Sequence, residues 1–64
     1  MIRLNGVDRE GAGLSIASLL AVQGIDPRGI AVAVDGEIVR RSNWADTIVK
    51  DESSVEIVTA AAGG

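Results

Sequence analysis

Several residue types with well-known chemistry are missing from this sequence of 64 residues, which has no cysteine, histidine, tyrosine or phenylalanine. Without histidine and cysteine there can be no Ser-His-Asp or Cys-His nucleophile and no typical zinc site. The lack of cysteine also excludes disulfides, and a small domain without them is expected in the cytoplasm. We therefore expect a protein on which other enzymes act, not an enzyme, with no permanently bound cofactor or metal.

Positive charge is also scarce, since six Lys and Arg residues face nine Asp and Glu residues, for a net charge of −3. A nucleic-acid-binding domain is expected to show a basic patch and stacking aromatic residues, so we expect no nucleic-acid partner. No run of about 20 apolar residues is present, so no membrane helix is expected. No charged segment followed by an apolar one opens the chain, so we expect no secretory signal. An acidic surface suits a protein partner with a basic docking face.

The first half of the chain predicts a hairpin followed by one helix. Residues 2–4 alternate apolar and polar, as in a half-buried strand, and a polar strand returns over 7–10. Between them, Asn5-Gly6 is typical of a type I′ turn, which needs positive φ at both central residues. Ser15 is a predicted helix N-cap, Ile16, Leu19 and Leu20 then share one helical face, and Gly24 ends the helix.

The second half predicts a second hairpin and a short helical turn, before a last strand. A strand over 30–34 carries alanines at 31 and 33, so its second face either packs closely against something or is left bare. Asp35-Gly36 is a second hairpin turn, followed by a return strand over 37–40. A short helical turn is expected over 42–46, starting at the cap-type residues Ser42 and Asn43. Within it, Trp44 is expected to close the open edge of the core and to donate its indole N–H.

The last strand is predicted over 54–59, with Val55 and Ile57 facing the core and Glu56 and Val58 facing away. A hairpin, a crossing helix and a late strand fit a mixed sheet in which the last strand lies parallel beside the first. One helix on one face of a sheet of four or five strands is an α+β arrangement. We therefore expect a ubiquitin-like β-grasp domain over residues 1–59, with a flexible C-terminal tail over 60–64.

The tail carries no side chain larger than a methyl group and ends in Gly63-Gly64. Extended, it could reach at most about 16–18 Å. That length would carry its carboxylate into a partner's active site through a channel too narrow for ordinary side chains, and glycine allows backbone to approach backbone closely. The alternative is that the two glycines have no function, because chain termini are often frayed and rich in small residues.

Taken over nearly its whole length, the chain resembles the ThiS family of sulfur-carrier proteins of thiamin biosynthesis. The segments that carry the resemblance are Leu4-Asn5-Gly6, the stretch from Asp26 to Val39, Arg41-Ser42-Asn43-Trp44, and the end from Asp51 to Gly63-Gly64. At Ala61-Ala62 relatives often carry a bulkier or amide residue, so the chain departs from the family's pattern there.

The resemblance implies that Gly64 is the covalent carrier. A ThiF-type enzyme would adenylate its carboxylate with ATP and magnesium, and a sulfur relay from a cysteine desulfurase would convert it to a thiocarboxylate. Thiazole synthase (ThiG) would then receive the sulfur. Gly63 would fit the channel, and Val58, Thr59 and Ala60 are the predicted docking surface beside the tail.

Three alternatives stay open at this point. The first is a sulfur carrier of another pathway, such as the small subunit of molybdopterin synthase. Those usually run longer and carry proline and an aromatic residue before the glycines. The second is a ubiquitin-like protein modifier that ends in an isopeptide bond to a lysine. The third is a plain binding module whose glycines are incidental.

Overall fold

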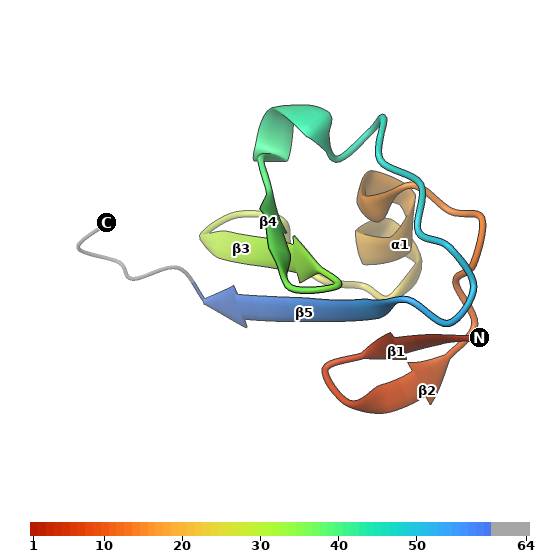
Figure 1. Ribbon diagram of the computed structural model, residues 1–64. Coiled ribbons are helices and arrows are strands. Elements are labelled where there is room, and N and C mark those ends of the chain that lie inside the picture. Colours follow the sequence, from red (N-terminus) through yellow and green to blue (C-terminus); the bar gives the residue numbers. More distant parts are fainter. Residues whose placement is uncertain (60–64) are drawn as a thin grey trace.

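The computed structural model describes residues 1–59, which form a five-stranded mixed sheet with one α-helix on one side of it (Figure 1). The strand order is β2-β1-β5-β3-β4. This confirms the predicted α+β, ubiquitin-like β-grasp fold. Of the predicted site residues, Ala60, Gly63 and Gly64 lie outside the described residues, as does the whole predicted tail over 60–64.

The N-terminal hairpin forms where the sequence predicts it, from β1 (Ile2–Leu4) and β2 (Val7–Arg9). Its two turn residues have φ of 49° at Asn5 and 83° at Gly6. Both values are positive, as a type I′ turn requires.

The single helix α1 (Ile16–Val22) is held at both ends as predicted. The Ser15 side chain accepts a hydrogen bond of 3.1 Å from the backbone N–H of Ser18, which satisfies one of the free donors at the N-terminus. Gly24 has a φ of 69° and follows the C-cap residue Gln23. The face of the helix that meets the sheet is fully apolar and buried, and consists of Ile16, Leu19 and Leu20.

The second hairpin consists of β3 (Ile30–Val34) and β4 (Glu37–Val39), joined by a turn with φ of 50° at Asp35 and 87° at Gly36. The predicted helical turn over 42–46 is partly wrong. The structure has a 3₁₀ turn, η1 (Arg41–Asn43), whose N-cap position, Arg40, makes no side-chain capping bond.

The neighbouring Trp44 explains this difference. It is only 5% exposed, and its indole N–H donates to the Val39 carbonyl oxygen at 2.9 Å, as expected from the sequence. The Arg41 guanidinium lies over the indole ring, 4.7 Å from its centroid. Burial of the indole, together with these contacts, positions the turn without a capping side chain.

Strand β5 (Ser54–Thr59) occupies the middle of the sheet. It runs parallel to β1, with Leu4 opposite Val55, and antiparallel to β3, with Ile30 opposite Thr59. The predicted placement of the last strand beside the first is therefore confirmed. Between the sheet and the helix lies one core of buried apolar side chains, made of Ile2, Leu4, Ile16, Leu19, Leu20, Val32, Trp44, Val49 and Val55. Within residues 1–59, no helix has the length and apolar character needed to cross a membrane.

Candidate functional site

The candidate site begins at the end of β5, because this strand leads to the predicted tail. Val58 and Thr59 are both exposed there, and Val58 keeps 57% of its surface accessible. Because successive side chains of a strand point to opposite faces, Val58 lies on the sheet face away from α1, and Thr59 lies on the other face. The third predicted docking residue, Ala60, is outside the described range.

An apolar patch covers part of the sheet face away from α1. We call it the outer patch, and it consists of Ala31, Ala33, Ile38 and Val58. The strand register brings them together, since Ala31 lies opposite Val58 and Ala33 lies opposite Ile38. Ile38 is 72% exposed, although it is a large apolar residue. Ala31 and Ala33 are themselves partly buried, and within residues 1–59 the helix α1 packs on the other face of the sheet.

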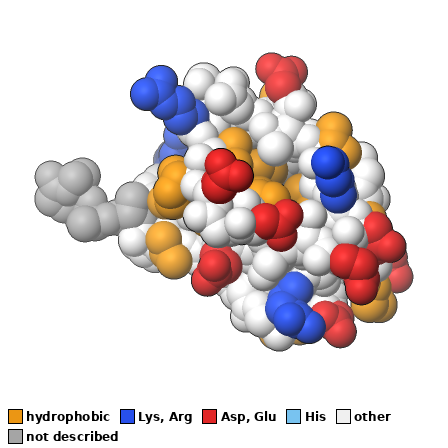
Figure 2. All heavy atoms as spheres, in the orientation of Figure 1, with side chains coloured by type: hydrophobic (Ala, Val, Ile, Leu, Met, Phe, Trp, Pro, Cys, Tyr) orange, Lys and Arg blue, Asp and Glu red, His pale blue; other side chains and the backbone are white. Residues whose placement is uncertain are grey.

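Charged residues lie beside the outer patch. Glu56 is exposed and sits opposite Ala33 on the neighbouring strand β5. On the face seen in Figure 2, apolar side chains are exposed near the end of β5, with acidic side chains on one side of them and basic side chains on another. An apolar centre with a charged rim is the usual composition of a surface that binds another protein.

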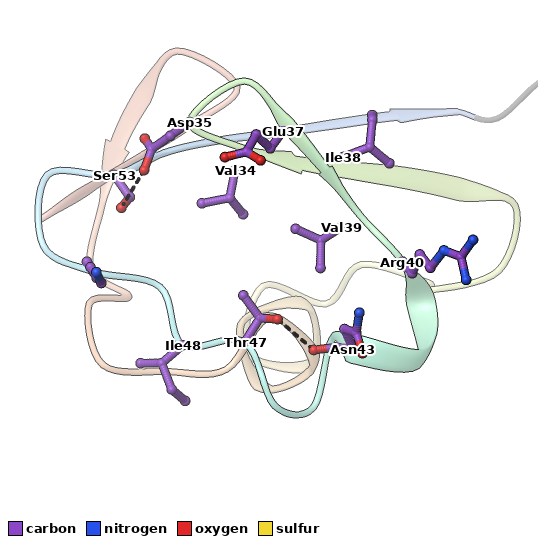
Figure 3. Close-up of a pocket in the computed structure, with 11 residues that line it drawn as sticks. Val34, Asp35, Glu37, Ile38, Val39, Arg40, Asn43, Thr47, Ile48 and Ser53 are labelled. Atoms are coloured by element: carbon purple, nitrogen blue, oxygen red, sulfur yellow. Dashed lines mark hydrogen bonds between the residues drawn. The ribbon is translucent and has the colours of Figure 1, made fainter.

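A hollow lies beside the β3–β4 hairpin, and both Ile38 and Val39 are among the residues that line it. Figure 3 shows Val34 and Val39 pointing into it. The Asp35 carboxylate at its rim accepts hydrogen bonds from the Ser53 hydroxyl at 3.2 Å and from the Ser54 backbone N–H at 2.9 Å. Through these two bonds, the Asp35 carboxylate holds the start of β5.

Over residues 1–59, no group of three or more His, Cys, Asp or Glu side chains gathers in a way that could hold a metal ion.

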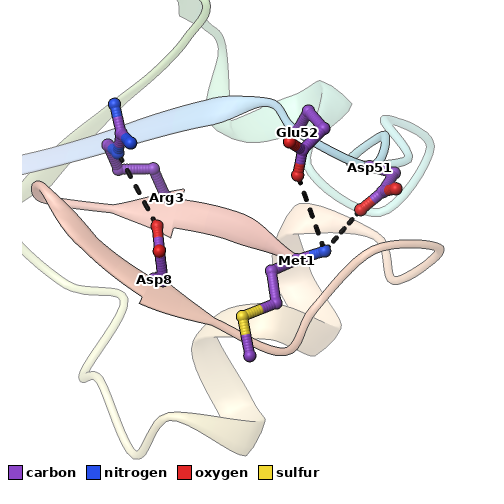
Figure 4. Close-up of polar contacts among 5 residues, drawn as sticks. All are labelled: Met1, Arg3, Asp8, Asp51 and Glu52. Carbon is purple, nitrogen blue, oxygen red and sulfur yellow. Dashed lines mark hydrogen bonds and ion pairs between the residues drawn. The ribbon is translucent and has the colours of Figure 1, made fainter.

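A second group of charged residues lies near the start of β1 and the loop before β5 (Figure 4). The α-ammonium group of Met1 bonds to the Asp51 carboxylate and lies 3.8 Å from that of Glu52. The hydrogen bond from this ammonium group holds the pKa of the Asp51 carboxyl below its usual value. The Nε atom of Arg3 lies 3.7 Å from the carboxylate of Asp8 on the adjacent strand. All of these groups are exposed, so they act as surface ion pairs of small energetic weight.

Comparison with known proteins assigns the chain to a family. A family model described as the ThiS family matches residues 2–64. The chain belongs to the ThiS family. A solved structure of the thiamine biosynthesis protein ThiS from Geobacter metallireducens is 28% identical, with a TM-score of 0.83, over 98% of this chain and 97% of that one. The resemblance to the ThiS family predicted from the sequence is therefore confirmed.

A curated relative is much longer than this ThiS-family chain. The thiazole synthase of Paramagnetospirillum magneticum is 37% identical over 62 residues, which cover 95% of this chain and 19% of that protein. The chain thus spans about a fifth of the length of this relative.

Sequence reasoning missed Ile38 as a member of the candidate surface. In a strand of only three residues, alternation cannot tell whether Ile38 or Val39 faces the core. The register with β3 decides it, because Val39 pairs with the buried Val32 and Ile38 pairs with Ala33.

Proposed function

We propose that this chain is a sulfur carrier of thiamin biosynthesis whose C-terminal Gly64 is the reactive group. The observation that carries the proposal is the family match over residues 2–64, which extends through Gly63-Gly64. Two relatives support it, one a thiamine biosynthesis protein and the other a thiazole synthase.

The proposed chemistry begins with activation of a poor electrophile. The Gly64 carboxylate attacks the α-phosphate of ATP on a ThiF-type enzyme in the presence of Mg²⁺, forming an acyl-adenylate and releasing pyrophosphate. A persulfide that carries sulfur from a cysteine desulfurase then displaces AMP to form an acyl disulfide. A thiol reductant cleaves this S–S bond, which leaves a new disulfide and a thiocarboxylate, and the thiocarboxylate gives its sulfur to a ThiG-type thiazole synthase. The chain itself has neither histidine nor cysteine, so it acts as a co-substrate while its partners supply the catalytic groups.

Recognition by the activating enzyme is assigned to the outer patch together with Thr59 and Ala60. Ile38 and Val58 are large, apolar and mostly exposed, so covering them with a partner would remove apolar surface from water. The net charge of −3 favours a partner with a basic docking face. Gly63 then passes through the narrow channel that leads to the ATP site.

The pairing with a ThiG-type enzyme rests on a different observation. A segment similar to nearly all of this chain occurs within a thiazole synthase that is about five times as long. A carrier and its sulfur acceptor that share one polypeptide would meet at high effective concentration, so such a fusion is expected of proteins that act in sequence.

Pyrophosphate exchange with a ThiF-type enzyme tests this proposal. We expect the intact chain to support ATP–pyrophosphate exchange, and a chain that lacks Gly63 and Gly64 to support none. Equal exchange with both chains would show that the C-terminal glycine is not the group that is activated. Conjugates of the chain to lysines of other proteins would instead indicate a protein modifier.

A further inference from the structure

Strand β5 is held near its C-terminal end by the side chain of Asn5, the first residue of the β1–β2 turn. The Asn5 amide oxygen accepts a hydrogen bond of 2.7 Å from the backbone N–H of Ile57. The Asn5 amide nitrogen donates a bond of 3.3 Å to the backbone carbonyl oxygen of the same residue. The Asn5 backbone N–H adds a bond of 2.9 Å to the Val55 carbonyl oxygen. One side chain thus satisfies both backbone groups of Ile57.

These bonds take the place of strand pairing beyond the end of β1. The pairing of β1 with β5 ends at Leu4 and Val55, because the chain turns at Asn5 and Gly6. β3, in contrast, pairs with β5 as far as Thr59. Among the bonds within residues 1–59, those of Asn5 are therefore the last along β5 on the β1 side, two residues before Thr59.

The turn alone does not require asparagine. A type I′ turn needs positive φ at position 5, and glycine or aspartate meets this need as well as asparagine does. Of these three residues, only asparagine offers both a donor and an acceptor to Ile57. The choice of asparagine is therefore explained by its contact with β5 and not by the turn.

The second hairpin provides a comparison within the same molecule. Asp35 occupies the same turn position, with a φ of 50°, and its carboxylate accepts a bond of 2.9 Å from the backbone N–H of Ser54. The Asp35 backbone N–H donates to the Ser54 carbonyl oxygen at 2.8 Å. Both turns thus hold β5, Asp35 at its first residue and Asn5 close to its last.

We propose that Asn5 is a positioning residue, which fixes the direction in which the last residues of β5 leave the sheet and so presents the C-terminal glycines to the activating enzyme. This inference rests on the proposed sulfur-carrier function. It assigns the residue a role through β5, without contact with the reacting carboxylate. A carrier whose strand end is already fixed loses less conformational freedom on docking, and this improves binding.

Asn5→Gly and the matched control Asp35→Gly test the proposal. Both variants keep a residue suited to positive φ, and both remove one side chain that holds β5. Amide hydrogen exchange should accelerate roughly five- to thirtyfold at Ile57 in the first variant and at Ser54 in the second. With a ThiF-type enzyme, Asn5→Gly should raise the KM for the carrier about fivefold or more. The kcat should stay unchanged, because the variant binds more weakly but, once bound, presents its C-terminus in the same way. Asp35→Gly should leave KM within about twofold of the wild type.

Three outcomes would overturn the proposal. The first is a wild-type KM in an Asn5→Gly variant whose Ile57 amide exchanges faster, and the second is an equal rise in KM for Asp35→Gly. The third is an unchanged rate of amide hydrogen exchange at Ile57 in Asn5→Gly, which is measured on the carrier without the enzyme. If Asn5→Gly does not fold, Asn5→Asp keeps the turn and the acceptor but loses the donor, and it should also raise KM. Failure of the wild-type chain to be adenylated at all would instead refute the proposed function, while hydrogen exchange would still decide whether Asn5 holds β5.

Discussion

Replacing Ile38 by alanine tests whether the outer patch docks the activating enzyme. Ile38 lies on the edge strand β4 and is 72% exposed, so it contributes little to the core. The loss of its β-branched side chain should lower the free energy of unfolding by about 1 kcal/mol or less. A larger effect on binding can therefore be separated from an effect on folding.

The expected effect on binding follows from the exposed fraction. Alanine lacks three carbon atoms of isoleucine, and each buried carbon contributes about 0.8 kcal/mol. Ile38 is 72% exposed, and only this exposed part can be newly covered by a partner. The three carbons, scaled by this fraction, therefore contribute about 1.7 kcal/mol to the free energy of binding. The KM of a ThiF-type enzyme for the carrier should therefore rise roughly fifteenfold, while kcat stays unchanged.

The assay is steady-state pyrophosphate release at several carrier concentrations, at a temperature where circular dichroism shows both variants folded. Val22→Ala is the matched control, because Val22 is 68% exposed on α1, away from the outer patch. It should leave KM unchanged. An Ile38→Ala carrier with wild-type KM, or a Val22→Ala carrier with an equally raised KM, would refute the assignment of docking to this patch.

Three further predictions concern the tail, the core and a surface turn. Gly63→Val should abolish adenylation and leave the fold intact, because a branched side chain cannot pass a channel shaped for glycine; unimpaired adenylation would refute the channel argument. Gly11→Ala should lower the free energy of unfolding in urea by about 1–3 kcal/mol. The new methyl group would lie 2.8 Å from Ile2 Cδ1 and 2.9 Å from Leu19 Cδ1 in the core, and an unchanged urea midpoint would contradict this. Hydrogen bonds from the Arg28 side chain and backbone N–H hold the pKa of Asp26 below its ordinary 3.8. This carboxylate therefore stabilises the fold above its ordinary pKa, and the contribution is lost as the pH falls through the lower folded value. The stability advantage of the wild type over Asp26→Asn should accordingly shrink between about pH 5 and pH 2, and a constant difference would contradict the assignment.

Much of the fold could be predicted because short-range signals agree with the final structure. A type I′ turn needs positive φ at both central residues and therefore favours Asn-Gly and Asp-Gly, so both hairpins could be predicted from two residues each, Asn5-Gly6 and Asp35-Gly36. Ser15 and Gly24 delimit the helix through local caps, which also depend only on neighbours in the sequence.

The start of η1 could not be predicted in this way. Cap-type residues at Ser42 and Asn43 suggested a local signal, but the turn starts at Arg41 without a capping side chain. Burial of Trp44 and its bond to the Val39 carbonyl oxygen depend on the surrounding structure, and these contacts position the turn.

The contact of Asn5 with Ile57 could not be predicted from the sequence for a related reason. The two residues are 52 positions apart, and their contact depends on β1 ending where β5 continues. Their types gave no sign of it, because Asn-Gly already predicts a hairpin turn without any further contact, and the alternation of the last strand already places Ile57 on the core face. Ile38 was missed because its orientation depends on the register between β3 and β4.

The central claim, a sulfur carried on the C-terminal glycine, is tested most directly by intact mass spectrometry. The chain is incubated with a ThiF-type enzyme, ATP, Mg²⁺ and a sulfur donor, and then treated with a thiol alkylator. Because the chain has no cysteine, alkylation distinguishes a thiocarboxylate from oxidation of Met1, which gives nearly the same mass change as exchange of oxygen for sulfur. The account predicts one alkyl adduct, mapped by fragmentation to Gly64. An adenylated chain that is never alkylated, or a chain that does not react, would contradict it.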